Sequence, residues 1–199
     1  MNILAHLYLS GGINDLMLGN FMGDFVKGNK YLAYSSDIQK GLLLHRQIDT
    51  YTDRHVTHKQ SRDRFREHYG LYSGIVVDIV YDHFLASHWD NFHEDNLETF
   101  AQNAYAHIKS NMHIIPPRLN QITPYIIENN WLVMYKSLEG IERVLTGMSK
   151  RTSLPAKVSN AMDVLDRNYE ELSIEFNEII SDLHKMVEKS LYLTKFAKN

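Results

Sequence analysis

An apolar run interrupted by two aspartates constrains the fold of this chain more than any other feature. Residues 75–86 are apolar or aromatic except for Asp78, Asp82 and His83. The run continues without a turn signal to Trp89, and this length favours a helix over a strand. Residues four apart share one face of a helix, so both carboxylates lie on one stripe. Because the other faces are apolar, we expect the helix to be buried nearly all round.

Two buried carboxylates on one stripe need a positive partner. A buried carboxylate without a partner is costly, and like charges four residues apart repel each other. The run contains no Lys or Arg, so the cation must come from another part of the chain or from a bound ion. A metal ion is the leading candidate. The chain has no cysteine, which excludes thiolate zinc sites, iron–sulfur clusters, disulfides and cysteine nucleophiles.

The distribution of proline predicts an all-α fold. The chain has four prolines and the first is Pro116, so the first 115 residues permit long helices. A length of 199 residues suits one domain with one core, and we expect a single-domain helical bundle over residues 1–199. The expected helices cover residues 13–26, 37–52, 57 or 61 to 69, 72–89, 96–111, 117–129 and 131–145, with one or two more between 155 and 197.

Composition excludes several functional classes. The hydrophobic content of 44% and the charged content of 23% are ordinary for a globular protein. A formal net charge of -3 argues against broad nucleic-acid binding. The first residues lack the basic start and long apolar core of a signal peptide, and no apolar run is long enough to span a bilayer. We therefore expect a cytoplasmic protein with no nucleic-acid or membrane partner.

A histidine and an aspartate four residues apart form a second polar stripe. His45 follows three leucines, residues 42–44, so its imidazole is expected to point toward the interior. One ring nitrogen can bind a metal while a carboxylate such as Asp49 orients the other. A purely structural His–Asp hydrogen bond on a half-buried face is the alternative interpretation.

Asp24 and His6 are further candidate ligands. Asp24 lies between Gly23 and Phe25, and the small glycine lets a ligand or another helix approach closely. His6 lies in an apolar segment, where a histidine often has only a structural role. An exposed aspartate near a helix end is the alternative for Asp24. The remaining histidines lie in polar surroundings and are expected at the surface: His55, His58, His68, His88, His93, His107, His113 and His184.

Carboxylates with one or two imidazoles indicate a particular group of metals. This donor set suits Mn²⁺, Mg²⁺ or Fe²⁺ better than structural zinc. A carboxylate-bridged di-iron bundle would need Glu-x-x-His on two helices, and no such spacing occurs. The His-Glu-x-x-His motif and the P-loop are also absent.

Short motifs follow one another in an order that is typical of one enzyme family. They are Met1-Asn2 with Leu4-Ala5-His6-Leu7; Gly19-Asn20, Asp24-Phe25-Val26 and Gly28-Asn29; Gly41, His45-Arg46, Ile48-Asp49 and Thr52-Asp53; Asp78, Asp82-His83-Phe84-Leu85 and His88-Trp89; Pro117-Arg118, Trp131-Leu132-Val133, Tyr135, Gly147-Met148 and Arg151. In these motifs the chain resembles the bacterial acyl carrier protein phosphodiesterase family, also called acyl carrier protein hydrolase. The likeness covers most of residues 1–155.

The resemblance implies an all-helical fold related to the HD-type metal phosphohydrolases. It also implies hydrolysis of the phosphodiester that joins 4′-phosphopantetheine to a serine of holo acyl carrier protein, with Mn²⁺ as the usual metal. The order Asp82-His83 differs from the usual His-Asp order of HD proteins. Which of these two residues faces the metal is therefore open, and the stripe shared with Asp78 favours Asp82.

We expect each candidate residue to have a defined role in this reaction. Asp24, His45, Asp78 and Asp82 would hold the ion, with His6 as a further ligand. Asp49 would orient His45 or bind the metal itself. Arg46 would neutralise phosphate charge, or alternatively form a salt bridge, and His83 would act as general acid for the leaving oxygen.

A basic segment directly follows the His45 stripe. An acyl carrier protein is strongly acidic, so a basic surface would attract it and raise the association rate. A solvated, charged helix is the alternative interpretation. The segment contains five cations and one acid, a balance of +4: Arg54, Lys59, Arg62, Arg64 and Arg66 against Asp63.

Two other functions remain compatible with the sequence. One is an HD-like phosphohydrolase that acts on a nucleotide or another small phosphoester. The other is a helical interaction module without enzymatic activity, in which Arg or Lys side chains neutralise the buried acids.

Overall fold

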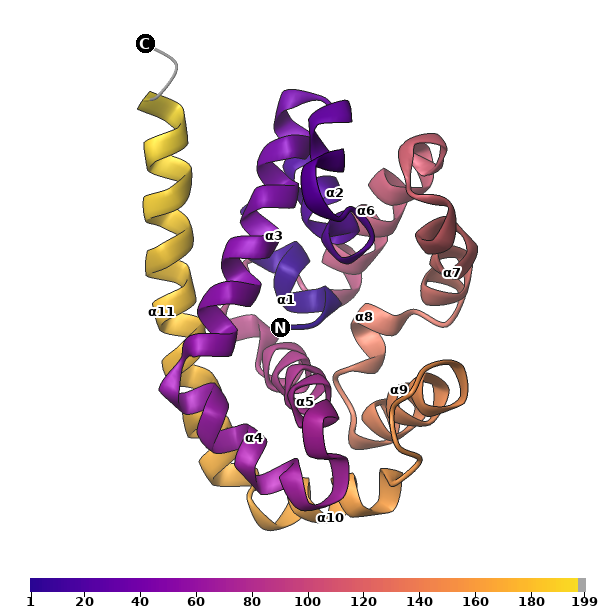
Figure 1. Cartoon of the computed structure of the whole chain (residues 1–199), viewed down its shortest axis with the longest axis vertical. Helices are drawn as coiled ribbons and strands as arrows, with labels where there is room; N and C mark the ends of the chain where they lie inside the picture. Colours follow the sequence, from indigo (N-terminus) through magenta and orange to yellow (C-terminus); the bar gives the residue numbers. More distant parts are fainter. Residues whose placement is uncertain (197–199) are drawn as a thin grey trace.

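The computed structural model describes the backbone of residues 1–196 and the side chains of residues 1–191. Every regular element in this part of the chain is a helix, which confirms the all-α prediction. Helix α5 (Ser73–Ser87) lies in the interior and the other helices surround it (Figure 1). These are α1 (Ile3–Tyr8), α2 (Asp15–Met22), α3 (Ser36–Arg54), α4 (Val56–Tyr69), α6 (Leu97–Ser110), α7 (Pro117–Glu128), α8 (Trp131–Met134), α9 (Leu138–Arg151), α10 (Val158–Arg167) and α11 (Tyr169–Phe196), with the short 3₁₀ helices η1 (Gly23–Phe25), η2 (Gly28–Ala33), η3 (Gly70–Tyr72), η4 (Trp89–Asn91) and η5 (Met112–Ile114).

Most expected helices are present, with two clear differences. Helix α1 was not expected from the sequence. The single helix expected over residues 131–145 is divided into α8 and α9. Ser137 causes the division, because its hydroxyl accepts the N–H of Gly140 at 3.0 Å and caps the start of α9. Gly70 ends α4 as expected, with a positive φ of 52° that glycine adopts without strain. The region expected to be helical from 155 to 197 contains α10 and α11; residue 197 lies outside the described residues.

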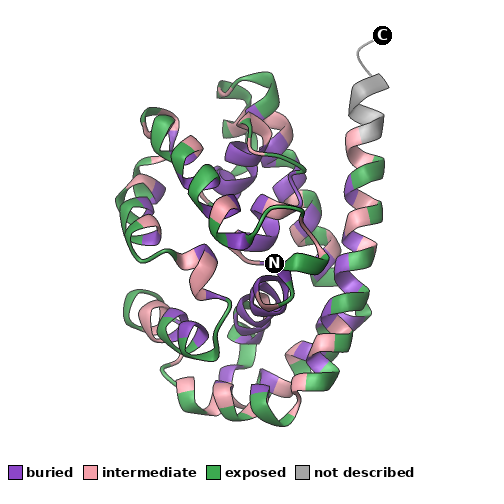
Figure 2. Ribbon diagram, turned by 180° about the vertical axis from the view of Figure 1, so that it is seen from behind, coloured by how far each residue is buried: buried purple, intermediate pink, exposed green. Residues whose placement is uncertain are grey.

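The burial of α5 confirms the prediction from its sequence. Val76, Val77, Ile79 and Leu85 point in different directions around the helix, and none of them is exposed. Figure 2 shows this helix as an almost continuous stretch of buried residues. It packs against α1, α4, α9 and α11. Because α5 is enclosed, its polar side chains must find partners on these neighbouring helices.

A carboxylate of α5 fixes the position of α1. Asp82 is fully buried, and its two oxygens accept the N–H groups of Leu4 at 2.8 Å and Ala5 at 3.2 Å. These N–H groups belong to the first turn of α1, where no acceptor exists within the helix and the helix dipole favours a negative charge. Burial raises the pKa of the Asp82 carboxyl to about 7, although the two N–H donors oppose this shift. The contact holds α1, which carries His6, against the core.

Two glycines allow α2 and α3 to touch through their backbones. A Cβ atom on Gly41 would lie 1.9 Å from the carbonyl oxygen of Leu16, and one on Gly19 would lie 2.2 Å from that of Ile38. No side chain fits between the helices at this crossing. The close approach places the end of α2 directly against the turn of α3 that carries His45.

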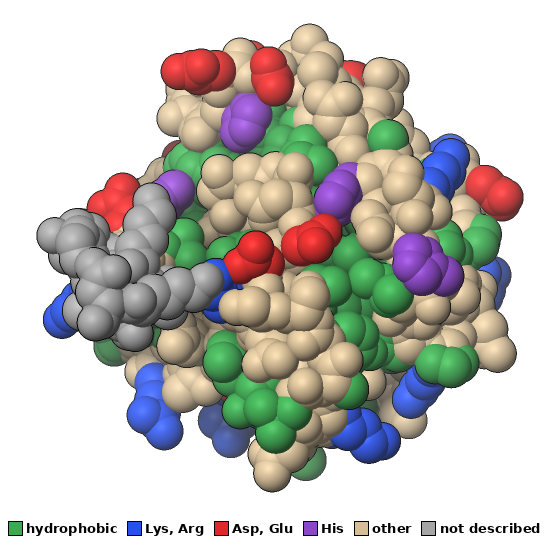
Figure 3. Space-filling model, turned by 90° about the horizontal axis from the view of Figure 1, so that it is seen from above, with side chains coloured by type: hydrophobic (Ala, Val, Ile, Leu, Met, Phe, Trp, Pro, Cys, Tyr) green, Lys and Arg blue, Asp and Glu red, His purple; other side chains and the backbone are tan. Residues whose placement is uncertain are grey.

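The surface does not show a single dominant charge. On the face drawn in Figure 3, acidic side chains lie near the centre and toward the upper edge, while lysines and arginines lie along the lower edge and at the sides, with apolar patches between them. None of the described helices is both long enough and apolar enough to cross a membrane.

We expect Gly41→Ala to destabilise the protein by about 1–3 kcal/mol or more, because the new methyl group overlaps a backbone carbonyl and α2 must move. Urea unfolding followed by circular dichroism measures the change. Gly147→Ala in α9 is the control: nothing lies within 4 Å of its Cβ position, so helix propensity should make it neutral or stabilising by up to about 1 kcal/mol. Equal effects at both positions would contradict the close approach of α2 and α3.

Candidate metal and phosphodiester site

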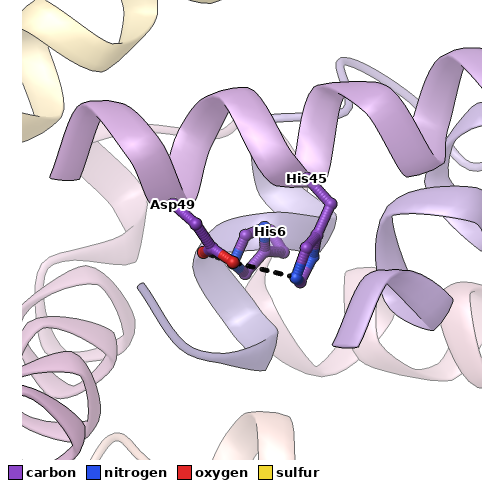
Figure 4. Close-up of side chains that lie close together, drawn as sticks. All are labelled: His6, His45 and Asp49. Carbon is purple, nitrogen blue, oxygen red and sulfur yellow. Dashed lines mark ion pairs between the residues drawn. The ribbon is translucent and has the colours of Figure 1, made fainter. Parts of the chain in front are cut away.

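Two histidines and one aspartate meet beside the crossing of α2 and α3. His6 comes from α1, while His45 and Asp49 lie one turn apart on α3 (Figure 4). The Nε2 atom of His6 lies 3.2 Å from one Asp49 oxygen, and that of His45 lies 3.1 Å from the other. The two rings are stacked, with centroids 4.1 Å apart. One possible ligand atom from each of the three residues falls within 4.8 Å of the others.

The two imidazoles differ in their affinity for a proton. Burial lowers the pKa of His6, and the positive charge of His45 lowers it further. Burial also acts to lower the pKa of His45, but Asp24 and Asp49 outweigh it and raise this pKa to about 9. Burial opposes ionisation of Asp49, yet the two imidazoles hold its pKa below the usual range. In the metal-free protein, a protonated His45 and an ionised Asp49 therefore form a pair beside a neutral His6.

Asp24 approaches the cluster from the solvent side. It lies in η1, and its carboxylate is 3.7 Å from Nε2 of His45 and 3.8 Å from the ammonium of Lys27. The preceding Gly23 makes room for the imidazole, because a Cβ atom there would lie 2.0 Å from the ring of His45. The small residue next to Asp24 therefore admits another helix, which was one of the two roles expected for it.

Four carboxylates line one hollow beside the cluster. Its volume is about 340 Å³, and Asp24, Asp49, Asp53 and Asp78 all contribute to its wall. Such a concentration of negative charge repels a phosphate group unless a cation is present. The complete lining is Met1, Asn2, Asp24, Asp49, Thr52, Asp53, Ile75, Asp78 and Met148.

Asp78 reaches this hollow but already has positive partners. Its carboxylate contacts Nε2 of His58 at 3.1 Å and the amino group of Met1 at 2.9 Å. Burial raises its pKa, but the Met1 ammonium and His58 outweigh this effect and lower the pKa to about 2. Groups of the chain itself thus supply part of the positive charge that the sequence of α5 requires. A role for Asp78 as a metal ligand stays a prediction.

Asp82 does not line the hollow, contrary to the expectation that it joins Asp78 at a metal. Both of its oxygens are bonded to the backbone of α1 at Leu4 and Ala5. The shared stripe on α5 is real, but one helical turn separates the two carboxylates, and the deeper one meets α1 instead of the hollow. Its geometry is that of a helix cap.

His83 and Arg46 also differ from their expected roles. In His83, Nδ1 is 2.8 Å from the carbonyl of Tyr135 and Nε2 is 2.9 Å from the hydroxyl of Tyr169, so both nitrogens are engaged away from the cluster. The guanidinium of Arg46 donates to the carbonyls of Val26 at 2.9 Å and Gly28 at 2.7 Å. It holds the loop after η1, and neither side chain is positioned for the chemistry expected of it.

Two further residues lie near the cluster that the sequence did not single out as site residues. His58 was expected at the surface, but it is 1% exposed and contacts Asp78. Its spacing from Ser61 and Phe65, three and seven residues later, places all three on the buried face of α4 and could have revealed it. Asn20 in α2 contacts both histidine rings. Its sequence signals are an amide within an apolar stretch and its place in the Gly19-Asn20 motif.

Comparison with known proteins identifies the family. The family model described as acyl carrier protein phosphodiesterase matches residues 1–183. Proteins named acyl carrier protein phosphodiesterase from Serratia proteamaculans and Pectobacterium atrosepticum are 34% and 35% identical, over 88% of this chain and 92% of each relative. One from Klebsiella pneumoniae is 32% identical over 94% of this chain and 98% of its own length. No solved structure matches. This chain belongs to the acyl carrier protein phosphodiesterase family.

Proposed function

We propose that this protein hydrolyses the phosphodiester between 4′-phosphopantetheine and a serine of holo acyl carrier protein, with the help of a divalent metal ion. The observation that carries the proposal is the convergence of two buried imidazoles and a carboxylate beside a hollow of the right charge for a cation. Membership in a family named for this activity supports the choice of substrate.

The residues present fit a divalent metal ion. Among the described residues, the partners of the buried Nε2 atoms of His6 and His45 are the carboxylates of Asp49 and Asp24. A cation among them would meet two imidazole nitrogens once His45 has lost its proton. Asp49 completes the set and Asp24 borders it. Imidazole with carboxylate suits Mn²⁺, and also Mg²⁺ or Fe²⁺. When bound, such an ion supplies Lewis acidity toward a phosphoryl oxygen and acidifies water.

The protein's own residues account for the remaining requirements of the reaction. Water must add to phosphorus, the bond to the serine oxygen must break, and that oxygen must gain a proton. Asp78 lines the hollow and contacts the buried His58, and this pair replaces His83 as our candidate for the proton transfer. Asp53 adds negative charge that favours cation binding over binding of free phosphate.

Basic residues lie one helical turn beyond this wall. His58 of α4 contacts Asp78 of α5; one turn further along, the side chain of Arg62 lies 3.6 Å from the Cβ position of Gly74. Arg62 makes no ion pair among the described side chains. Together with Lys59 and Arg66 it borders a second hollow of about 300 Å³, to which Asp63 contributes the one acid. We propose that this corner attracts the acidic carrier protein while the carboxylate-lined hollow receives the phosphodiester.

Two residues of the expected basic surface, Arg64 and Arg54, do not belong to this corner. Arg64 is paired with Glu175 at 2.7 Å, which neutralises it. Arg54 borders a separate groove between α3 and α11, together with Arg46 and Lys189. Leu71, which is 91% exposed, adds an apolar contact point at the basic corner. The docking surface that we propose is therefore Lys59, Arg62, Arg66 and Leu71.

The direct test of this function uses purified protein, holo acyl carrier protein and Mn²⁺. Mass spectrometry should show conversion of the holo to the apo form, and chelation should abolish it. A parallel panel of nucleotides and small phosphoesters tests the alternative substrates. Turnover of the panel without turnover of carrier protein would overturn the proposal. A folded protein that binds no Mn²⁺ and turns over neither substrate class with Mn²⁺ present would favour an interaction module.

Asp49→Ala should lower kcat/KM for holo carrier protein by more than about 100-fold, because the metal loses a carboxylate ligand. Loss of a residue that only hydrogen-bonds a metal ligand typically costs about 10–100-fold, so a direct ligand should cost more. Metal uptake, measured by calorimetry, should fall in parallel. Glu94→Ala removes an exposed carboxylate elsewhere and should change neither quantity. An Asp49→Ala protein with normal metal affinity would show that the cluster is structural.

Metal affinity should rise with pH between about 7 and 9. His45 has a pKa of about 9 in the metal-free protein and must lose its proton to bind a metal, so affinity should rise by up to about tenfold per pH unit. The raised pKa of His45 also stabilises the folded, metal-free protein. This stabilisation is fully present below pH 6.5, the pKa of His45 in the unfolded chain, and it is lost as the pH rises through about 9. Calorimetry at several pH values should show both the slope and the released proton. A metal affinity that does not change with pH would contradict a protonated His45 in the metal-free protein.

Arg62→Glu combined with Arg66→Glu should lower kcat/KM for carrier protein at low salt, and the loss should shrink as salt screens the charges. Metal binding should be unchanged. Lys109→Glu combined with Lys136→Glu makes the same change in net charge at exposed positions, one on α6 and one in the turn between α8 and α9, and serves as the control. Equal kinetics of the two double variants at low salt would remove the docking surface from the proposal.

A further inference from the structure

The side chain of Asn20 connects the elements that carry the two histidines. It is fully buried in α2, and its oxygen lies 2.8 Å from Nδ1 of His6. Its amide nitrogen donates to the carbonyl of His6 at 2.7 Å and to the hydroxyl of Ser10 at 2.9 Å. Its own backbone carbonyl lies 2.9 Å from Nδ1 of His45. One residue thus contacts the Nδ1 atom of both rings.

The orientation of this amide follows from its partners. A backbone carbonyl can only accept hydrogen bonds, so the amide atom next to the His6 carbonyl must be the NH₂ group. The amide oxygen must then face Nδ1 of His6, and it too can only accept. Nδ1 of His6 therefore carries the proton.

The same reasoning applies to His45. Its Nδ1 atom faces the backbone carbonyl of Asn20, which accepts and cannot donate. In both rings the proton on Nδ1 leaves Nε2 as the atom that can bind a metal. Both Nε2 atoms face Asp49, on the side of the cluster that borders the hollow.

We propose that Asn20 is a positioning residue that fixes the proton of His6 on Nδ1 and so presents the Nε2 lone pair to a divalent cation. It acts on His6 through its side chain and on His45 through its backbone. The proposal deepens the proposed function and rests on it, because a defined tautomer matters most where Nε2 is a ligand. The location of the proton can be measured without any metal.

The first test is long-range ¹H–¹⁵N NMR of the metal-free wild-type protein at neutral pH, with His6 and His45 assigned by substitution. In the neutral form of His6 we expect the proton on Nδ1. A neutral His6 ring with its proton on Nε2 would overturn the proposal, whether or not the protein binds metal or hydrolyses carrier protein. Absence of metal binding by a wild-type protein with the expected tautomer would instead contradict the proposed function.

The second test is Asn20→Ala, which removes the acceptor of His6 but keeps the backbone carbonyl that faces His45. We expect the His6 proton to distribute over both nitrogens while the contact of His45 Nδ1 is retained, and Mn²⁺ affinity to fall by about 10–100-fold. Ser10→Ala is the matched control, since it removes a hydrogen bond from the same amide without touching either ring. Its His6 tautomer and metal affinity should equal those of wild type.

These variants separate positioning from general stability. If Ser10→Ala and Asn20→Ala lower the unfolding midpoint similarly, but only Asn20→Ala changes the His6 spectrum and the metal affinity, the positioning role is supported. Asn20→Ala with an unchanged His6 spectrum overturns it. Should Asn20→Ala fail to fold, the wild-type spectrum alone decides between the two tautomers.

Discussion

The site depends on the contact between the backbones of α2 and α3. At Gly19 and Gly41 the two helices approach so closely that no side chain fits between them. This contact brings the end of α2 to the turn of α3 that carries His45. Asn20 can then accept from the ring of His45, and Gly23 leaves space for that ring. A larger residue at any of these glycines would move the imidazole away from Asp49.

The buried helix α5 contributes in two different ways. Asp82 uses both oxygens to hold the start of α1, and through it the position of His6. Asp78, one turn earlier, reaches the wall of the hollow and contacts His58. The same residue type is therefore structural at one position and available for chemistry at the other. The difference arises from what lies opposite each carboxylate: helix N–H groups in one case and a solvent-connected hollow in the other.

Charge is arranged in two adjacent regions with opposite signs. Four aspartates surround the hollow, whereas Lys59, Arg62 and Arg66 lie around the neighbouring corner of α4 and α5. An acidic protein that carries a phosphodiester meets repulsion at the first region and attraction at the second. A cation in the hollow would reverse the repulsion locally. The arrangement gives a physical reason why metal binding and partner docking would be required together.

The sequence by itself determined the helical class, the burial of α5 and the pairing of His45 with Asp49, because helical periodicity fixes which residues share a face. It also singled out Asp24 and His6, which the structure brings to the same cluster. Only the tertiary structure decided that Asp82 caps α1, that His83 and Arg46 are engaged elsewhere, and that Asn20 and His58 belong to the site. Periodicity shows the direction in which a side chain points along its own helix, whereas its role depends on the atoms that a distant segment places opposite it.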